Sequence, residues 1–301
     1  MRYSALAGRA ATRAVLEAHG HAANYRLGQN FLIDDAVVGK ILALAGVGSG
    51  SVDGAERAAQ RPAFLEVGPG IGTLSVALLP FGDVVAIERD ESLADVLADT
   101  TAGYAGRFLL IRADALKVDA AVIERACADA GMGVPRLLVA NLPYNVAATL
   151  VLDYFERMGF LDAMVVMVQS EVADRMCATP GTKTYGAYTV KLRLHARVVE
   201  RFSVAPGSFL PAPHVESAVV RLERNASGID APTRGHACEL AEAAFAQRRK
   251  NIRNSMRSRY DVELVDELLR ACGISPNVRG ETLQPDDFVR MARAYEELLA
   301  R

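Results

Sequence analysis

The feature that most constrains the fold is an alternation of short apolar runs with helical stretches, which begins at Ala63. The apolar runs are AFLEV (63–67), DVVAIE (83–88), RFLLIRAD (107–114), RLLVAN (136–141) and DAMVVMVQ (162–169). Their content of Val, Ile and Leu is typical of strands that are covered on both faces. Strands of this kind, joined by helices, form a parallel sheet between helical layers. The sequence therefore predicts an α/β fold.

The pattern changes after Gln169. We predict two further strands over 188–202 and 216–224, and then helices over 236–259, 262–273 and 286–300. Residues 224–235, RNASGIDAPTRG, have the composition of a linker. We therefore predict an α/β domain over residues 1–230 and a smaller α-helical domain over 231–301. The Gly/Ser/Ala-rich stretch from Gly46 to Pro62 is predicted to be a polar loop.

Composition limits the class of protein. Of the 301 residues, 51% are hydrophobic and 23% are charged, as in globular chains. The sequence has no apolar run of about eighteen residues for a membrane span, and its Arg-containing N-terminus has no apolar segment for a secretory signal. The four cysteines are scattered and the five histidines do not cluster. We therefore expect a cytoplasmic protein with no metal site and no disulfide.

A glycine-rich turn, EVGPGIGT (66–73), joins the first predicted strand to a helix. Glycine lets the backbone approach a ligand closely, and a helix N-terminus favours anionic or polar ligand groups. Glu88 ends the next strand, 20 residues after Gly68. A carboxylate at that point can accept hydrogen bonds from both hydroxyls of a ribose. Alone, this pattern fits NAD, FAD or S-adenosylmethionine.

Two residues favour S-adenosylmethionine among these cofactors. Pro69 removes an N–H group that a pyrophosphate could use, and Asp114, which ends the third strand, can accept a hydrogen bond from the exocyclic amine of an adenine. Gly68, Glu88, Asp114 and Asn141 follow four successive strands, and an open α/β sheet binds its ligand at the carboxyl ends of its strands. The sequence therefore predicts a Rossmann-like domain that binds S-adenosylmethionine.

The fourth strand ends in Asn141-Leu142-Pro143-Tyr144, which we interpret as the catalytic turn. The exocyclic amine of adenine is a poor nucleophile because its lone pair is delocalised into the ring. The amide oxygen of Asn141 and a carbonyl of the rigid Leu142–Pro143 turn can accept its two hydrogens and free the lone pair for methyl transfer. Tyr144 can stack on a base that has left its own stack. A strand-ending turn with a half-buried tyrosine is the plainer alternative.

Seven stretches, in order along the chain, resemble one known family. They are GQNFLID (28–34), LEVGPGIGTLS (65–75), AIERD (86–90), RADAL (112–116), NLPYN (141–145), SFLPAPHVESAVVRL (208–222) and AFAQRRKNIRNS (244–255). Together they resemble the KsgA/RsmA family of small-subunit ribosomal RNA adenine dimethyltransferases. The stretch from Gly46 to Pro62 is longer than is usual in that family.

The resemblance implies a reaction, a cofactor and a set of site residues. The reaction is the N6,N6-dimethylation of two adjacent adenines in the hairpin loop near the 3′ end of small-subunit (16S) rRNA, during ribosome biogenesis. The implied S-adenosylmethionine contacts are Asn30, Leu32, Gly68, Glu88, Asp114 and Asn141. Phe209 is implied as a second aromatic ring, which sandwiches the target adenine opposite Tyr144. The implied partner is a precursor particle of the small subunit, bound by a monomeric enzyme.

Other functions stay open at this point. A large-subunit rRNA adenine N6-methyltransferase of the antibiotic-resistance type shares the early motifs, although AFAQRRKNIRNS favours the small-subunit enzyme. A DNA adenine N6-methyltransferase uses a similar turn, usually with different flanking residues. A ribosome-assembly factor that acts mainly by binding is a third possibility, against which Asn141 and Glu88 argue. Pro69 argues against a dehydrogenase.

A basic segment lies near the C-terminus of a chain whose net charge is −2. Between Phe245 and Tyr260 there are six Lys and Arg residues and no acid. We predict one continuous helix here, whose spacing places three arginines on one face for contacts with RNA phosphates. The predicted RNA-binding residues are Arg248, Arg249, Lys250, Arg253 and Arg257. A solvated basic helix face is the alternative.

Overall fold

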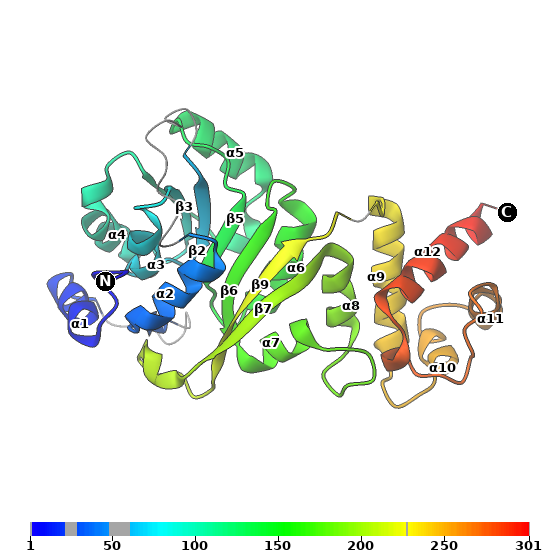
Figure 1. The fold of residues 1–301 in the computed structure, drawn as a ribbon. Helices are drawn as coiled ribbons and strands as arrows, with labels where there is room; N and C mark the ends of the chain where they lie inside the picture. Colours follow the sequence, from blue (N-terminus) through cyan, green and yellow to red (C-terminus); the bar gives the residue numbers. More distant parts are fainter. Residues whose placement is uncertain (1, 22–28, 48–60, 227, 301) are drawn as a thin grey trace. The chain divides into compact units, whose positions relative to one another are not determined.

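The computed structural model describes residues 2–21, 29–47, 61–226 and 228–300, which form two compact units. The sheet unit comprises Met1–Ala173 and Val198–Arg224, and the helical unit comprises Asp174–Arg197 and Asn225–Arg301. Figure 1 shows the ribbon of both units.

The sheet unit is built around a seven-stranded sheet in the order β4-β3-β2-β5-β6-β9-β7. The strands are β2 (Ala63–Val67), β3 (Asp83–Glu88), β4 (Phe108–Arg112), β5 (Leu137–Asn141), β6 (Ala163–Gln169), β7 (Ala196–Val204) and β9 (Ser217–Arg224). The first five pair in parallel, as the alternating sequence predicts, and β9 pairs with β6 in the antiparallel sense. The strand order reverses at β2, which lies between β3 and β5. Ligands of open α/β sheets bind at such a point.

Helices cover both faces of this sheet (Figure 1). The helices of the sheet unit are α1 (Arg9–Ala18), α2 (Asp35–Leu44), α3 (Thr73–Leu78), α4 (Ala94–Thr100), α5 (Ala120–Asp129) and α6 (Ala147–Arg157), with short 3₁₀ turns at Glu91–Leu93, Ala102–Tyr104, Ala115–Lys117 and Pro206–Ser208. Val38 and Ile41 of α2 pack in one cluster with Val139 and Val165 of the sheet. The alternate strand residues are also fully buried, as Leu138 is, so both faces of the sheet are covered.

A two-stranded antiparallel ladder joins two distant parts of the sheet unit. It consists of β1 (Phe31–Leu32) and β8 (Phe209–Leu210), and it pairs Leu32 with Phe209. The Ser208 hydroxyl donates a hydrogen bond to Asp34 over 2.9 Å, at the N-cap of α2. The ladder thereby anchors the segment that begins at Gln29 beside the strand ends.

The helical unit has its own apolar core. Its helices are α8 (Ala187–His195), α9 (Ala231–Phe245), α10 (Ile252–Met256), α11 (Val262–Ala271) and α12 (Pro285–Leu299), with a 3₁₀ turn at Gly280–Thr282; α7 (Ser170–Cys177) crosses from the sheet unit into it. Val190 and Leu194 of α8 pack with Leu240 of α9 and Phe288 of α12. Residues 174–197 belong to this unit because of that packing, which the predicted boundary at residue 230 did not include. The break after Arg224 lies close to that boundary.

The predicted strand over 188–202 is wrong in its first half. Residues up to His195 form α8, and only Ala196–Val204 form a strand. The sequence TVKLRLH alternates like a strand, but the helix contacts α9 and α12 with Val190 and Leu194 and also buries Thr189 and Leu192. Because the helix is buried around much of its circumference, its sequence lacks the 3.6-residue period of apolar residues that would have identified it.

The predicted continuous helix over 236–259 is also wrong. It ends at Phe245, and a new helix begins at Ile252 with Asn251 as its N-cap, whose side chain accepts a hydrogen bond from the N–H of Asn254 over 2.9 Å. The Ser255 hydroxyl holds the break by donating to the Ala243 carbonyl over 2.8 Å. The predicted loop from Gly46 to Pro62 lies largely outside the described residues.

Candidate active site

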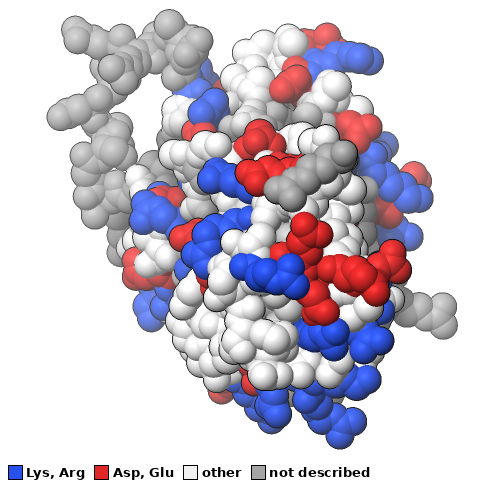
Figure 2. All heavy atoms as spheres, turned by 90° about the vertical axis from the view of Figure 1, so that its right-hand side faces the viewer, with Lys and Arg blue, Asp and Glu red and all other residues white. Residues whose placement is uncertain are grey.

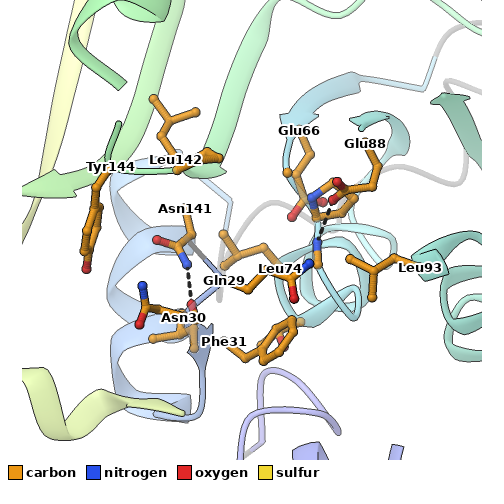
Figure 3. A pocket seen from close by; sticks show the side chains of 16 residues that line it. Gln29, Asn30, Phe31, Glu66, Leu74, Glu88, Leu93, Asn141, Leu142 and Tyr144 are labelled. Carbon is orange, nitrogen blue, oxygen red and sulfur yellow. Dashed lines mark hydrogen bonds between the residues drawn. The ribbon is translucent and has the colours of Figure 1, made fainter. Parts of the chain in front are cut away.

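Two adjoining cavities lie at the carboxyl ends of β2, β3 and β5, and Figure 3 shows the first of them. The predicted residues around the first cavity are Asn30, Leu32, Gly68, Glu88, Asn141, Leu142, Pro143 and Tyr144. The second cavity is lined by Asp114, Ile87, Leu116 and Asn145, among others. Gly68, Glu88 and Pro143 line both. The structure therefore brings together every predicted site residue of the sheet unit except Phe209.

The glycine-rich turn brings the backbone to the cavity wall. Gly68 and Gly70 have φ values of +68° and +60°, which residues with a Cβ rarely adopt. A Cβ atom on Gly70 would lie 3.1 Å from the ring of Phe31, and one on Gly68 would lie 3.5 Å from Pro143. Both contacts bring the turn close to the cavity walls contributed by β1 and by the turn after β5.

Glu88 ends β3 with its carboxylate held by three backbone N–H groups. Arg89 and Asp90 donate to one oxygen over 2.8 and 2.9 Å, and Gly70 donates to the other over 3.4 Å (Figure 3). Burial raises the pKa of Glu88, and the N–H donors oppose that rise. The carboxylate is thereby fixed between the two cavities.

A second carboxyl group in the first cavity was not predicted. Glu66 lies in β2, is 2% exposed, and accepts a hydrogen bond from the Ser75 hydroxyl over 2.5 Å. The pKa of Glu66 is raised to about 8, chiefly by burial, against the lowering effect of the Ser75 hydrogen bond and with a smaller contribution from the charge of Glu88. Glu66 is therefore mostly protonated at neutral pH. Its signal in the sequence is the one acid in the apolar run AFLEV, which forms a strand whose five residues are all buried.

Asp114 lines the second cavity. It lies in a loop that accepts hydrogen bonds from side chains of α6. The Asp114 carboxylate accepts a hydrogen bond from the N–H of Leu116 over 3.2 Å. The Tyr154 hydroxyl donates to the carbonyl of Ala115 over 3.0 Å, and Arg157 donates to the carbonyl of Val118 over 3.3 Å. Both donors lie on α6, which follows the Asn141–Tyr144 turn, so one helix connects this turn with the Asp114 loop.

The side-chain amide of Asn141 has a defined orientation. Its Nδ2 donates to the carbonyl of Asn30 over 3.0 Å, so its oxygen is the group left to face the cavity (Figure 3). The backbone carbonyls of the next two residues, Leu142 and Pro143, differ in their hydrogen bonding. The Pro143 carbonyl accepts hydrogen bonds from Val146 and Ala147, both over 3.1 Å, whereas no hydrogen bond from a described residue reaches the carbonyl of Leu142. The Asn141 oxygen and the Leu142 carbonyl are thus two available acceptors on consecutive residues that both line the cavity.

Tyr144 lies beyond Asn141, on the side away from Glu88 (Figure 3). Its ring is half-buried, and its hydroxyl lies 2.6 Å from the hydroxyl of Ser217, the first residue of β9. Burial raises the pKa of Tyr144, and the Ser217 hydrogen bond opposes that rise. Ser217 was not predicted as a site residue, because only the fold brings it to Tyr144.

Phe209 is not among the residues that line either cavity, and its position opposite Tyr144 stays a prediction. Its ring is fully buried in the core that α2 forms with the sheet, and its backbone pairs with Leu32. Burial of an aromatic ring among Val, Leu and Ile side chains is strongly favourable. Tyr144 and Phe31 are the aromatic residues among those that line the first cavity, whereas the Phe209 ring packs in the core.

The five basic residues predicted to bind RNA lie in the helical unit but not on one helix face. Arg253 pairs with Asp266, at 2.7 Å for its Nη2, and Arg248 donates to the carbonyls of Lys183 and Tyr185. The remaining three, Arg249, Lys250 and Arg257, are exposed and form no ion pair with any described residue. Figure 2 shows Lys and Arg gathered at the foot of the face in view, below a group of acids.

No helix among the described residues is long and apolar enough to cross a membrane. The same part of the chain contains no group of three or more His, Cys, Asp or Glu residues that could hold a metal ion.

The strand order, and the cavities at the carboxyl ends of the strands, define the class of this protein as a Rossmann-like α/β domain with a ligand site at that edge. Residues 20–297 match the family model described as ribosomal RNA adenine dimethylase. The chain belongs to this family of RNA-modifying enzymes, as its resemblance to KsgA/RsmA predicted.

The similar proteins agree with this membership. A ribosomal RNA small subunit methyltransferase A from Rhodococcus opacus is 40% identical over 97% of this chain and 95% of its own length. The protein of the same name from Magnetococcus marinus is 37% identical over 92% and 94%. A dimethyladenosine transferase from Plasmodium falciparum has the same fold, with a TM-score of 0.69 and 20% identity over 89% of this chain and 98% of its own. The 23S rRNA methyltransferase ErmE has a TM-score of 0.60 and 23% identity over 89% and 100%.

Proposed function

We propose that this protein dimethylates the N6 atoms of two adjacent adenines in small-subunit ribosomal RNA, in the hairpin loop near its 3′ end, with S-adenosylmethionine as the methyl donor. The observation that carries the proposal is the oriented amide of Asn141, whose oxygen points to the cavity because its nitrogen donates to the Asn30 carbonyl. The relatives at about 40% identity, named for the small subunit, support that substrate over the large subunit.

The two cavities fit S-adenosylmethionine, whose sulfonium carries the methyl group to be transferred. Glu88 lines both cavities and can accept hydrogen bonds from two ribose hydroxyls between them. The adenine then falls in the cavity with Ile87, Leu116 and Asp114, where apolar walls and one acceptor match a purine with an exocyclic amine. The sulfonium end falls in the cavity of Asn141 and Tyr144.

The residues around the methyl group prepare the acceptor base. The Asn141 oxygen and the Leu142 carbonyl accept the two hydrogens of the adenine amine, which localises its lone pair on nitrogen for attack. Preorganised acceptors of this kind need no strong base, because the proton leaves after methyl transfer. Tyr144 stacks on the face of the adenine and holds it away from its neighbouring bases.

The exposed basic residues of the helical unit supply the contacts to RNA phosphates in this proposal. Lys250 and Arg257 line one shallow hollow together with the amides of Gln247 and Asn254, and Arg249 is exposed in the same turn. Such contacts give affinity and register with little sequence information. The proposed partner is a precursor particle of the small subunit, bound in the cytoplasm by one copy of the chain.

Asn141→Ala tests the chemistry directly. The variant removes one preorganised acceptor, so we expect turnover to fall by about 10²–10³-fold. The assay follows labelled methyl groups from S-adenosylmethionine onto small-subunit particles that lack the modification. Calorimetry measures cofactor affinity, which should change far less than turnover. A variant that methylates these particles at the wild-type rate would remove Asn141 from the mechanism.

A further inference from the structure

Ser217 carries a hydroxyl group that the packing of β9 does not need. The residue is fully buried, and it is followed by the equally buried Ala218, Val219 and Val220. A buried hydroxyl without a partner destabilises the fold, and alanine would fill nearly the same space. Within the described part of the chain, Tyr144 is the one hydrogen-bonding partner of the Ser217 side chain, at 2.6 Å. The hydroxyl is therefore explained by Tyr144.

The backbone of Ser217 is held firmly by its neighbours in the sheet. It lies opposite Gln169 in the antiparallel register of β6 and β9, and just beyond this pair the N–H of Ser170 donates to the Glu216 carbonyl over 2.9 Å. Tyr144, in contrast, belongs to the turn between β5 and α6. The hydrogen bond therefore holds the hydroxyl end of Tyr144, a turn residue, at Ser217, the first residue of a sheet strand.

We propose that Ser217 is a positioning residue, which sets the direction of the Tyr144 ring for stacking on the target adenine. The inference rests on the proposed function, in which Tyr144 holds that base. The turn fixes the Cα end of Tyr144 and Ser217 fixes its hydroxyl end, so the long axis of the ring is defined at both ends. Among the described residues that line this cavity, Tyr144 and Phe31 are the aromatic ones, and Tyr144 belongs to the same turn as Asn141. A ring held in place before the substrate arrives needs less ordering in the complex.

The test compares Ser217→Ala, Tyr144→Phe and the double variant in the methyl-transfer assay on unmodified small-subunit particles. Each single variant removes the same hydrogen bond, so each should lower kcat by about 3- to 10-fold, with cofactor affinity unchanged. The double variant should be no slower than the slower single variant, because the bond can be lost only once. Tyr185→Phe is the matched control. It deletes the hydroxyl that donates to the Leu283 carbonyl over 2.8 Å in the helical unit, and it should leave kcat unchanged.

The outcomes separate this inference from the proposed function. Tyr144→Ala removes the ring and should lose most activity; a fully active Tyr144→Ala would overturn the stacking role itself. If Tyr144→Ala is inactive while Ser217→Ala and Tyr144→Phe match the wild type, the stacking role stands and the positioning role falls. Multiplicative losses in the double variant, or an equal loss in Tyr185→Phe, would assign the effect to stability and also overturn it. If Ser217→Ala does not fold, Tyr144→Phe alone decides by the same criterion.

Discussion

Two glutamates in one cavity differ in the donors that surround them. The Glu88 carboxylate accepts hydrogen bonds from three backbone N–H groups. The Glu66 carboxyl group accepts one, from a hydroxyl group, and is almost fully buried. N–H donors stabilise a carboxylate, and burial without them favours the neutral acid. Glu88 is therefore suited to accept hydrogen bonds from a ligand, while Glu66 is mostly a protonated wall residue at neutral pH.

Glu66 should make the fold less stable as the pH rises. Its pKa is about 8 in the folded chain and near the ordinary value of 4.5 in the unfolded chain. Between these values the unfolded chain loses the proton that the folded chain keeps, so the free energy of unfolding falls with increasing pH. Glu66→Gln has no proton to lose and still accepts from Ser75. We expect the melting temperature of the variant, relative to wild type, to rise from pH 5 to pH 8. Parallel curves would show that Glu66 titrates normally.

Glu88→Ala should nearly abolish S-adenosylmethionine binding. Each lost hydrogen bond from a ribose hydroxyl to this carboxylate costs about 1.5–3 kcal/mol, and the backbone N–H groups of the turn lose their acceptor as well. Isothermal titration calorimetry measures the loss, and circular dichroism checks that the fold is kept. Wild-type affinity in the variant would exclude Glu88 as the ribose contact.

At the residue scale, the sequence located the site through residues that follow strands. Gly68, Glu88, Asp114 and Asn141 could be predicted because the carboxyl ends of parallel strands share one edge of the sheet. Ser217 could not be predicted, since its role depends on a contact with Tyr144, 73 residues away. The burial of Phe209 could not be predicted for the same reason, because burial depends on what packs around a side chain.

Among the elements, the turn between α9 and α10 determines which basic residues are available for RNA. The break after Phe245 separates Arg249 from Arg253, and Asp266 neutralises Arg253. The sequence contained a signal for this break, because Asn251 is a favoured N-cap residue ahead of Ile252. The prediction of one continuous helix relied on the basic residues of this stretch and did not use the N-cap signal.

Charge reversal at the exposed basic residues on either side of α10 should weaken RNA binding without affecting the cofactor. The triple variant Arg249→Glu, Lys250→Glu, Arg257→Glu removes those three of the five predicted RNA-binding cations that form no ion pair with a described residue. We expect lower affinity for small-subunit RNA and a salt dependence flatter by about 0.7–0.9 log units per lost phosphate contact. Filter binding at several salt concentrations measures both quantities.

Arg253→Gln is the matched control for this variant. It removes a cation that is already paired with Asp266, so RNA binding should change little, although stability should fall. If Arg253→Gln weakens RNA binding as much as the triple variant does, the unpaired cations are not the contact set.

At the scale of the whole molecule, alternating strands and helices were enough to predict the parallel sheet and its ligand edge. The assignment of residues 174–197 to the helical unit was beyond prediction, because it depends on packing against helices that follow residue 230. The strand-like alternation of residues 189–195 pointed to the wrong element for a related reason. Tertiary burial determined the structure of this segment, and local propensity did not.

The central claim is that this chain dimethylates two adjacent adenines of small-subunit rRNA. Its most direct test is mass spectrometry of the 3′ region of that rRNA from a strain that lacks the gene. We predict that both N6,N6-dimethyladenines are absent there and return when the wild-type gene is restored. If both persist in the deletion strain, the claim is contradicted. It is also contradicted if the deletion removes adenine methylation from large-subunit rRNA instead.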